Sequence, residues 1–230
     1  KGGTSLLLLL SKPMRLSTDI DIVVEPGTDI DAYIQKAAAI FPFKSGGEQE
    51  RKVHGKIEKR HFKFFYDSPV RSGKELYILL DVLFEKNHYA QLVQKEIAND
   101  LLLTEGENQL VSIPSVDCVL GDKLTAFAPY TTGIPLRKEK DMEVIKQFFD
   151  VSTLTNEITD FDLVRRTYFD ICDTEIGYRE LDITPADALM DSIQAAICIC
   201  SRGKSNEDDF PCYLRGTRDI SQHIYVQGFS

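Results

Sequence analysis

Hydrophobic and polar residues follow two different periods in the first third of the chain. Acidic and aliphatic side chains alternate from Asp19 to Glu25, which is typical of a half-buried strand, and a Pro-Gly pair ends the run. Apolar residues at helical spacing, such as Ile30 and Ile34, indicate an amphipathic helix. The pattern predicts a mixed sheet with packed helices, with strands at residues 19–25, 57–66 and 76–84 and helices at residues 4–11 and 29–40.

Helical patterns dominate after about residue 87. Ser115 is a suitable N-cap for one helix, and Thr184 followed by Pro185 opens another. We expect an α+β fold in which a mixed sheet with packed helices (residues 1–113) precedes a C-terminal helical bundle (residues 114–230), with residues 87–114 as the candidate linker region. The expected helices cover residues 115–127, 140–154, 162–178 and a last stretch from residue 184, whose apolar stripe is Leu189, Ile193, Ala196, Ile197 and Cys200.

Composition indicates a soluble, cytoplasmic protein. A chain of 230 residues with 43% hydrophobic residues can bury an ordinary core. Its longest apolar run, from Leu6 to Leu10, is far shorter than the roughly 20 residues that span a bilayer. Five cysteines without a CxxC pair suit a reducing compartment, where we expect them as buried thiols. No histidine stands at a ligand spacing from Cys198 and Cys200, which excludes a zinc site there.

Charge is unevenly distributed along the chain. A net charge of −9 argues against sequence-independent binding of nucleic acid over the whole surface, because such binding relies on Lys and Arg. Residues 51–74, however, contain eight Lys or Arg and two acids, with four aromatic residues between them. This basic segment could bind a polyanion or could be a solvated hairpin face. Its basic residues are Arg51, Lys52, Lys56, Lys59, Arg60, Lys63, Arg71 and Lys74.

Three aspartates are candidate metal ligands. Asp19 and Asp21 project from one face of a predicted strand, and two like charges so close are unfavourable unless a cation lies between them. Mg²⁺ prefers such oxygen ligands, although surface strands also place similar pairs in solvent. Asp81 is the one ionisable residue in an almost wholly apolar strand expected to be buried on both faces. Either a shared metal ion or a basic partner such as Lys123 must stabilise it.

A possible phosphate cradle precedes these acids. Gly2, Gly3, Thr4 and Ser5 stand at a predicted helix start, where backbone N–H groups and hydroxyls can bind phosphate. Such a tetrapeptide is usually only a turn. Its position before the paired carboxylates is what makes it informative.

The order of these features resembles the nucleotidyltransferase superfamily to which DNA polymerase beta belongs. KGGTSL at residues 1–6 and RLSTDID at residues 15–21 are similar to the G-G-T-x-L…R-x-S-x-D-x-D pattern of AbiEii toxins, including the MenT-like enzymes. PSVDCVLGDKLTA at residues 114–126 and KQFFD at residues 146–150 resemble the same family. The resemblance extends to about residue 154 and implies a nucleotidyltransferase-type sheet whose helical domain completes the nucleotide site.

The resemblance also implies roles for individual residues. Asp19, Asp21 and Asp81 would hold Mg²⁺ (or Mn²⁺), with Asp81 as general base or as ligand of a second ion. Lys123 would contact the triphosphate of an NTP substrate, and Asp150 would be the late acid of the last motif. The implied nucleotide-binding residues are Gly2, Gly3, Thr4, Ser5, Arg15, Ser17, Lys123 and Lys146.

The last motif leaves two alternatives open. Several relatives have Arg-Asp where this chain has Lys146 and Gln147, so Asp141 is an alternative to Asp150 as the late acid. Lys146 and Asp150 could also be an ordinary i,i+4 surface pair. No triad spacing relates the histidines to a nucleophile, and no role is assigned to His54, His61, His88 and His223.

Three functions are consistent with these residues. The first is a toxin that adds nucleotides to an RNA acceptor, the 3′ end of tRNA, and that has an antitoxin protein as partner. The second is a small-molecule nucleotidyltransferase of the aminoglycoside-modifying kind, which would need an acidic pocket for its polycationic acceptor. The third is a catalytically inactive binding module of the same fold, which the presence of all three acids disfavours.

Overall fold

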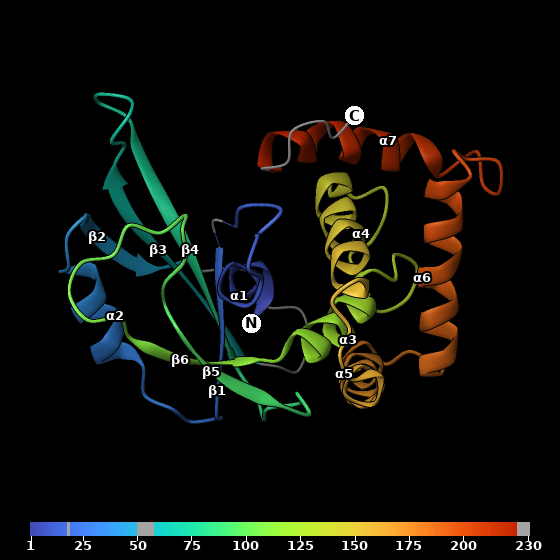
Figure 1. Ribbon diagram of the computed structural model, residues 1–230, viewed down its shortest axis with the longest axis horizontal. Coiled ribbons are helices and arrows are strands. Elements are labelled where there is room, and N and C mark those ends of the chain that lie inside the picture. Colours follow the sequence, from blue (N-terminus) through green and yellow to red (C-terminus); the bar gives the residue numbers. More distant parts are fainter. Residues whose placement is uncertain (18, 50–57, 225–230) are drawn as a thin grey trace. The chain divides into compact units, whose positions relative to one another are not determined.

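The computed structural model describes residues 1–17, 19–49 and 58–224, which form two compact units (Figure 1). Unit 1 consists of Lys1–Leu7 and Ser17–Asn87, and unit 2 of Leu8–Leu16 and His88–Ser230. The strands are β1 (Asp19–Val24), β2 (Phe43–Glu48), β3 (Glu58–Asp67), β4 (Glu75–Phe84), β5 (Leu92–Glu96) and β6 (Leu110–Pro114). The helices are α1 (Gly2–Leu9), α2 (Asp31–Ala38), α3 (Val116–Ala126), α4 (Asp141–Thr155), α5 (Phe161–Arg179), α6 (Pro185–Cys200) and α7 (Phe210–Ile220), followed by the short 3₁₀ helix η1 (Ser221–His223).

Unit 1 is built on a four-stranded mixed sheet. Its strand order is β1-β4-β3-β2, with β1 parallel to β4 and β3 antiparallel to both of its neighbours. One face of the sheet packs against α2, and the buried side chains there include Phe62, Phe64 and Val82. Fully burying one such side chain contributes roughly 1.5–3 kcal/mol. The alternation of strand residues therefore directs the odd-numbered positions of β1, β3 and β4 to the opposite face.

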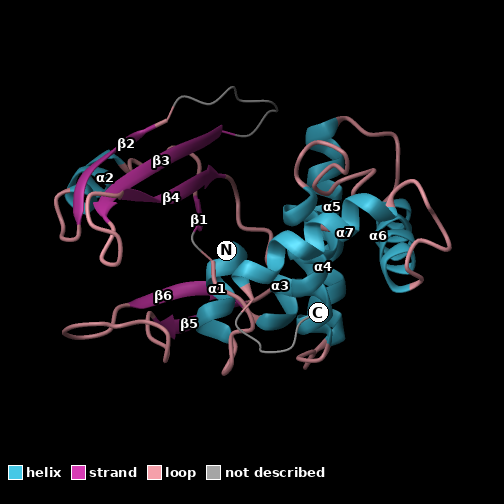
Figure 2. Cartoon of the chain, turned by 90° about the horizontal axis from the view of Figure 1, so that it is seen from above, coloured by secondary structure: helices cyan, strands magenta, loops and turns pink. Residues whose placement is uncertain are grey.

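Unit 2 is mainly helical (Figure 2). One apolar cluster of this unit joins side chains of α4, α6 and α7, including Val144, Cys198 and Tyr213. Gly121 on α3 allows α5 to approach closely, because a Cβ there would lie 2.7 Å from the carbonyl oxygen of Val164. The predicted α+β fold, a mixed sheet with helices and a C-terminal helical part, is confirmed.

Two local expectations were wrong. Residues 87–114 are not a plain linker, because β5 and β6 pair there as an antiparallel two-stranded sheet. The expected apolar stripe of α6 faces the core only in part, since Leu189 and Ala196 pack against apolar clusters whereas Ile193 and Ile197 are exposed. The reason is Asp191, whose carboxylate accepts hydrogen bonds from the Tyr130 backbone N–H and the Thr131 hydroxyl and thereby turns a polar position inward.

The compact units divide after Asn87, where the sequence pattern also changes. The expected division into a catalytic core (residues 1–113) and a helical domain that completes the nucleotide site (residues 114–230) stays a prediction. All five cysteines are unpaired, and four are buried as expected, whereas Cys200 is exposed. No helix in the described ranges is long and apolar enough to cross a membrane.

Candidate active site

The three predicted metal-ligand carboxylates lie on neighbouring strands of unit 1. Asp21 on β1 and Asp81 on β4 are paired in register, and Asp19 pairs with Leu79 two residues earlier. Paired residues of parallel neighbours are about 4.8 Å apart and project to the same face. All three acids therefore belong to the face opposite α2. Their adjacency across β1 and β4 could not be read from the strand patterns alone.

Asp81 has a histidine partner that the sequence did not indicate. The Nδ1 atom of His61 lies 2.7 Å from Oδ1 of Asp81, and the two residues are paired in register across β3 and β4. The expectation that strand β4 buries Asp81 was too strong, because 28% of its side chain is exposed. Lys123 forms its ion pair with Asp150 instead. The alternation of β3 was the one available signal, because His61 is next to the inward residue Phe62 and therefore projects from the opposite face.

The chemistry of these side chains fits a hard divalent cation, whereas their present positions do not form a complete coordination site. Three carboxylates on one face supply the oxygen ligands that Mg²⁺ prefers, and their mutual repulsion favours a bound cation. Among the described residues, no three His, Cys, Asp or Glu side chains are placed to hold a metal ion. Oδ1 of Asp81 contacts His61, and metal binding would require the side chains on this face to move closer together. A metal ion at this face stays a prediction.

The glycine-rich segment lies directly against these acids. Gly2 begins α1 with φ of +75°, and a Cβ there would lie 2.0 Å from Oδ2 of Asp21, so only glycine fits. The Thr4 hydroxyl donates to the backbone oxygen of Asp19, and the Ser5 hydroxyl donates to that of Gly2 at 2.7 Å. The helix therefore starts at Gly2 rather than Thr4. Its first turn supports strand β1, and phosphate binding by this segment stays a prediction.

The second group of candidate residues forms a buried ion cluster in unit 2. Arg15 binds Asp150 through two contacts, Nε to Oδ1 at 2.6 Å and Nη2 to Oδ2 at 2.7 Å. Nζ of Lys123 lies 2.9 Å from Oδ2 of Asp150. The side chains of Arg15, Lys123 and Asp150 are 5%, 8% and 1% exposed. Asp150 is thus not a surface partner of Lys146, and that alternative was wrong.

Charge in this cluster does not balance. Among the described residues, Asp150 is the only carboxylate in an ion pair with either cation, so two cations and one anion leave a net charge of +1. Burial of Asp150 raises the pKa of its carboxyl, but Lys123 and Arg15 outweigh burial and hold that pKa below its ordinary value. An excess buried positive charge is unfavourable unless an anion approaches it.

Gln147 completes the surroundings of Lys123. Its Oε1 accepts a hydrogen bond from Nζ of Lys123 at 2.9 Å. Gln147 departs from the family pattern, yet its carbonyl oxygen occupies an acceptor position beside the lysine. Lys146, which precedes Gln147 on α4, is half-buried.

Ser17, the remaining predicted nucleotide-binding residue, belongs to unit 1. Its hydroxyl lies 3.5 Å from the backbone oxygen of Asp19.

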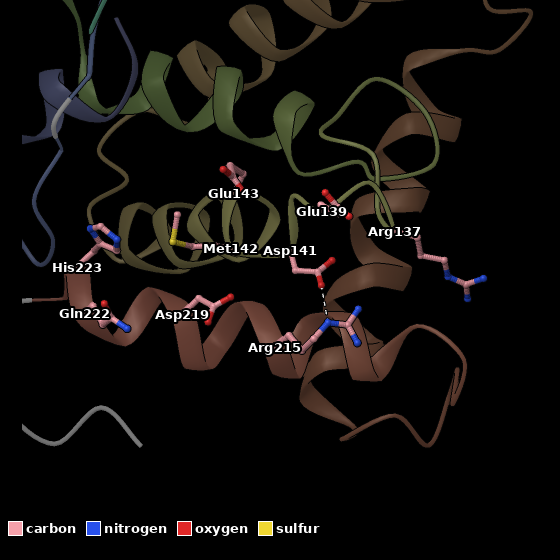
Figure 3. Close-up of a pocket in the computed structure, with 9 residues that line it drawn as sticks. All are labelled: Arg137, Glu139, Asp141, Met142, Glu143, Arg215, Asp219, Gln222 and His223. Atoms are coloured by element: carbon pink, nitrogen blue, oxygen red, sulfur yellow. Dashed lines mark hydrogen bonds and ion pairs between the residues drawn. The ribbon is translucent and has the colours of Figure 1, made fainter. Parts of the chain in front are cut away.

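Asp141 occupies a different part of α4. Its Oδ2 lies 2.9 Å from Nε of Arg215 on α7, in the pocket of Figure 3. Asp141 and Asp150 are nine residues apart on one helix, which separates them by about 14 Å along its axis. Of these two aspartates, it is Asp150 that contacts Lys123 and Arg15.

The basic segment is only partly available to an anion. Arg51, Lys52 and Lys56 lie outside the described residues, as does the first residue of the predicted strand at 57. Arg60 is bound by Glu48 at 2.7 Å and by Asp31 at 2.8 Å on the α2 side of the sheet. These ion pairs account for Arg60 without a bound polyanion.

Comparison with known proteins identifies one family. Residues 1–197 match the model of the family described as nucleotidyl transferase AbiEii toxin, type IV TA system. The match continues beyond residue 154, where the recognisable motifs end. No curated protein matches the sequence.

Proposed function

Because the chain belongs to the AbiEii nucleotidyltransferase toxin family of type IV toxin–antitoxin systems, we propose that it transfers a nucleotide from an NTP to a hydroxyl of an RNA acceptor. The proposed acceptor is the 3′ end of a tRNA, and the proposed cofactor is Mg²⁺ or Mn²⁺. A cytoplasmic location and a cognate antitoxin protein belong to the same proposal.

One observation carries the catalytic part of this proposal. Asp21 and Asp81 occupy paired positions of adjacent parallel strands, with Asp19 on the same face. An inactive binding module has no need of three carboxylates held in mutual repulsion. Gly2 supports the same conclusion, because the helix start approaches Asp21 so closely that any side chain at Gly2 would collide with its carboxylate.

The residues of unit 1 would bind and orient the reacting groups. Asp19, Asp21 and Asp81 would hold the metal ion, which would supply Lewis-acid chemistry for phosphoryl transfer. Asp81 would accept the proton of that hydroxyl. His61 would hold the Asp81 carboxylate on the acid face through its contact of 2.7 Å until substrate arrives.

The residues of unit 2 would bind the leaving phosphates. Lys123 has three N–H donors, of which two contact Asp150 and Gln147, and the third would donate to a triphosphate oxygen. Asp150 is proposed as the late family acid because it orients Lys123, and Arg15 would fix Asp150 in turn. The excess positive charge of this cluster supports anion binding. Lys146 would contribute a further positive charge.

The test is transfer of label from each α-labelled NTP to total tRNA with Mg²⁺. We expect label on RNA with the unmodified protein and none with Asp21→Asn, which removes one charge without changing size. Asp29→Asn is the matched control, because Asp29 is exposed on the same unit. Equal labelling by Asp21→Asn would refute the assigned acids. Absence of label with every NTP would refute RNA as acceptor, and label on an aminoglycoside instead would favour the small-molecule function.

A further inference from the structure

Two aromatic residues and a lysine share the sheet face of the catalytic acids. Lys63 and Phe65 on β3 stand two and four residues after His61, and Tyr77 on β4 stands four residues before Asp81. Register pairs Phe65 with Tyr77 and His61 with Asp81. Because these positions have the same parity, all of these side chains project from the face opposite α2.

Tyr77 contacts both of the other side chains. Nζ of Lys63 lies 4.0 Å from the centre of the Tyr77 ring, and the rings of Phe65 and Tyr77 are 6.0 Å apart at 62°. Tyr77 is 48% exposed. We call Lys63, Phe65 and Tyr77 the aromatic platform. An exposed aromatic surface of this kind is a common attachment point for a flat apolar ligand.

On the edge strand β2, the described side chains do not cover the platform. The β2 residues paired with Phe65 and Lys63 are Ser45 and Gly47, whose side chains are small or absent. A Cβ at Gly47 would meet no other described atom within 4 Å. By contrast, the α2 face of the same sheet is closed by Phe62 and Phe64. The platform is therefore not covered by the paired β2 side chains, and the group that lies over the Tyr77 ring is the flexible Lys63 side chain of the platform itself.

Nucleobases are the planar ligands that this chemistry favours. Bases stack on aromatic side chains of open four-stranded sheets, and lysines beside them contact the phosphates. Lys59 and Lys63 flank His61 on the platform face of β3 and can contact phosphates between the platform and the acids. Tyr77 is four residues from Asp81, which corresponds to about 13 Å along the strand. The platform is thus close to the acids without coinciding with them.

We propose that the aromatic platform binds an unpaired base of the acceptor strand, upstream of the hydroxyl that receives the nucleotide. This inference rests on the proposed transfer to RNA and adds the site where single-stranded acceptor is held. A base within a duplex is stacked on its neighbours and cannot reach Tyr77, so the platform selects a single-stranded end. The base of the NTP is the other possible source of the same chemistry, and the test separates the two.

The test measures binding and needs no transfer reaction. A single-stranded RNA of about ten nucleotides, labelled at its 5′ end, is titrated with the full chain and followed by fluorescence anisotropy. Tyr77→Leu should weaken its binding by about tenfold, which is the loss typical of one stacked base, while affinity for unlabelled NTP stays unchanged. Lys63→Gln should lower the dependence of log K on log salt by about 0.7, the effect of one phosphate contact.

Matched variants separate recognition from stability. Tyr77→Phe keeps the ring and should bind as the unmodified protein does, and Tyr33→Leu makes the same change at an exposed tyrosine of α2. Unchanged RNA affinity in Tyr77→Leu overturns the proposal and leaves the platform as a cross-strand packing cluster. A fall in NTP affinity also overturns it. Because binding is read without catalysis, a protein that binds RNA through Tyr77 but transfers nothing would contradict the proposed function alone.

Discussion

Removing the charge of Asp150 should destabilise unit 2 strongly. Asp150→Asn keeps the size of the side chain but leaves Arg15 and Lys123, which are 5% and 8% exposed, without their carboxylate. Three contacts of 2.6–2.9 Å are affected. Breaking a buried pair by removing one partner costs about 3–5 kcal/mol, because uncompensated charge stays buried.

Urea unfolding followed by far-UV circular dichroism measures this loss, since the chain has no tryptophan to report by fluorescence. The midpoint should fall by more than about 1 M. Asp162→Asn is the matched control, because Asp162 forms a 2.8 Å pair with Arg165 that is more than half exposed, and such pairs contribute about 0–1 kcal/mol. If the midpoint of Asp150→Asn falls no further than that of the control, the cluster is not the buried, charge-dependent unit described above.

Three further outcomes follow from local geometry. Gly2→Ala should abolish transfer and also lower the melting temperature, because its Cβ would collide with the Asp21 carboxylate and alanine is strained at a φ of +75°; a transfer assay and a melting curve check this together. Thr184→Ala should cost about 1 kcal/mol in urea unfolding, because it removes the capping box that Thr184 and Asp187 form at α6. Acid should weaken unit 2, because folding lowers the pKa of the Asp150 carboxyl. The stability that this carboxylate contributes is complete above the ordinary pKa of 3.8 and is lost as the pH falls below that value. The difference in stability between the unmodified protein and Asp150→Asn, measured by urea unfolding, should therefore shrink below about pH 4.

Local patterns predicted β1, β3, β4 and most helices, because alternation and helical spacing are properties of neighbouring residues, but they missed β2, β5, β6 and α7. They also assigned Asp19 and Asp21 to one face of β1. What the patterns could not supply was pairing between distant segments. The pairing of Asp21 with Asp81 depends on a parallel register between β1 and β4, and the contact of His61 with Asp81 depends on β3 joining the same sheet.

Buried polar residues account for the clearest errors. Spacing allows an exposed pair of Asp150 with Lys146, yet its partner Arg15 is 135 residues away in sequence and lies in the same compact unit. Asp191 faces inward on α6 because the backbone N–H of Tyr130 needs its carboxylate, and the apolar residues Ile193 and Ile197 are consequently exposed. Propensity and periodicity carry no information on such partners.

Manganese binding tests the central claim most directly. Titration of Mn²⁺ into the unmodified protein, followed by electron paramagnetic resonance, should show an affinity that Asp19→Asn, Asp21→Asn and Asp81→Asn each weaken by at least about tenfold, because each removes a charged oxygen ligand. Asp29→Asn should leave it unchanged. Equal affinity in all four variants would contradict the assignment of the metal to the paired strands β1 and β4.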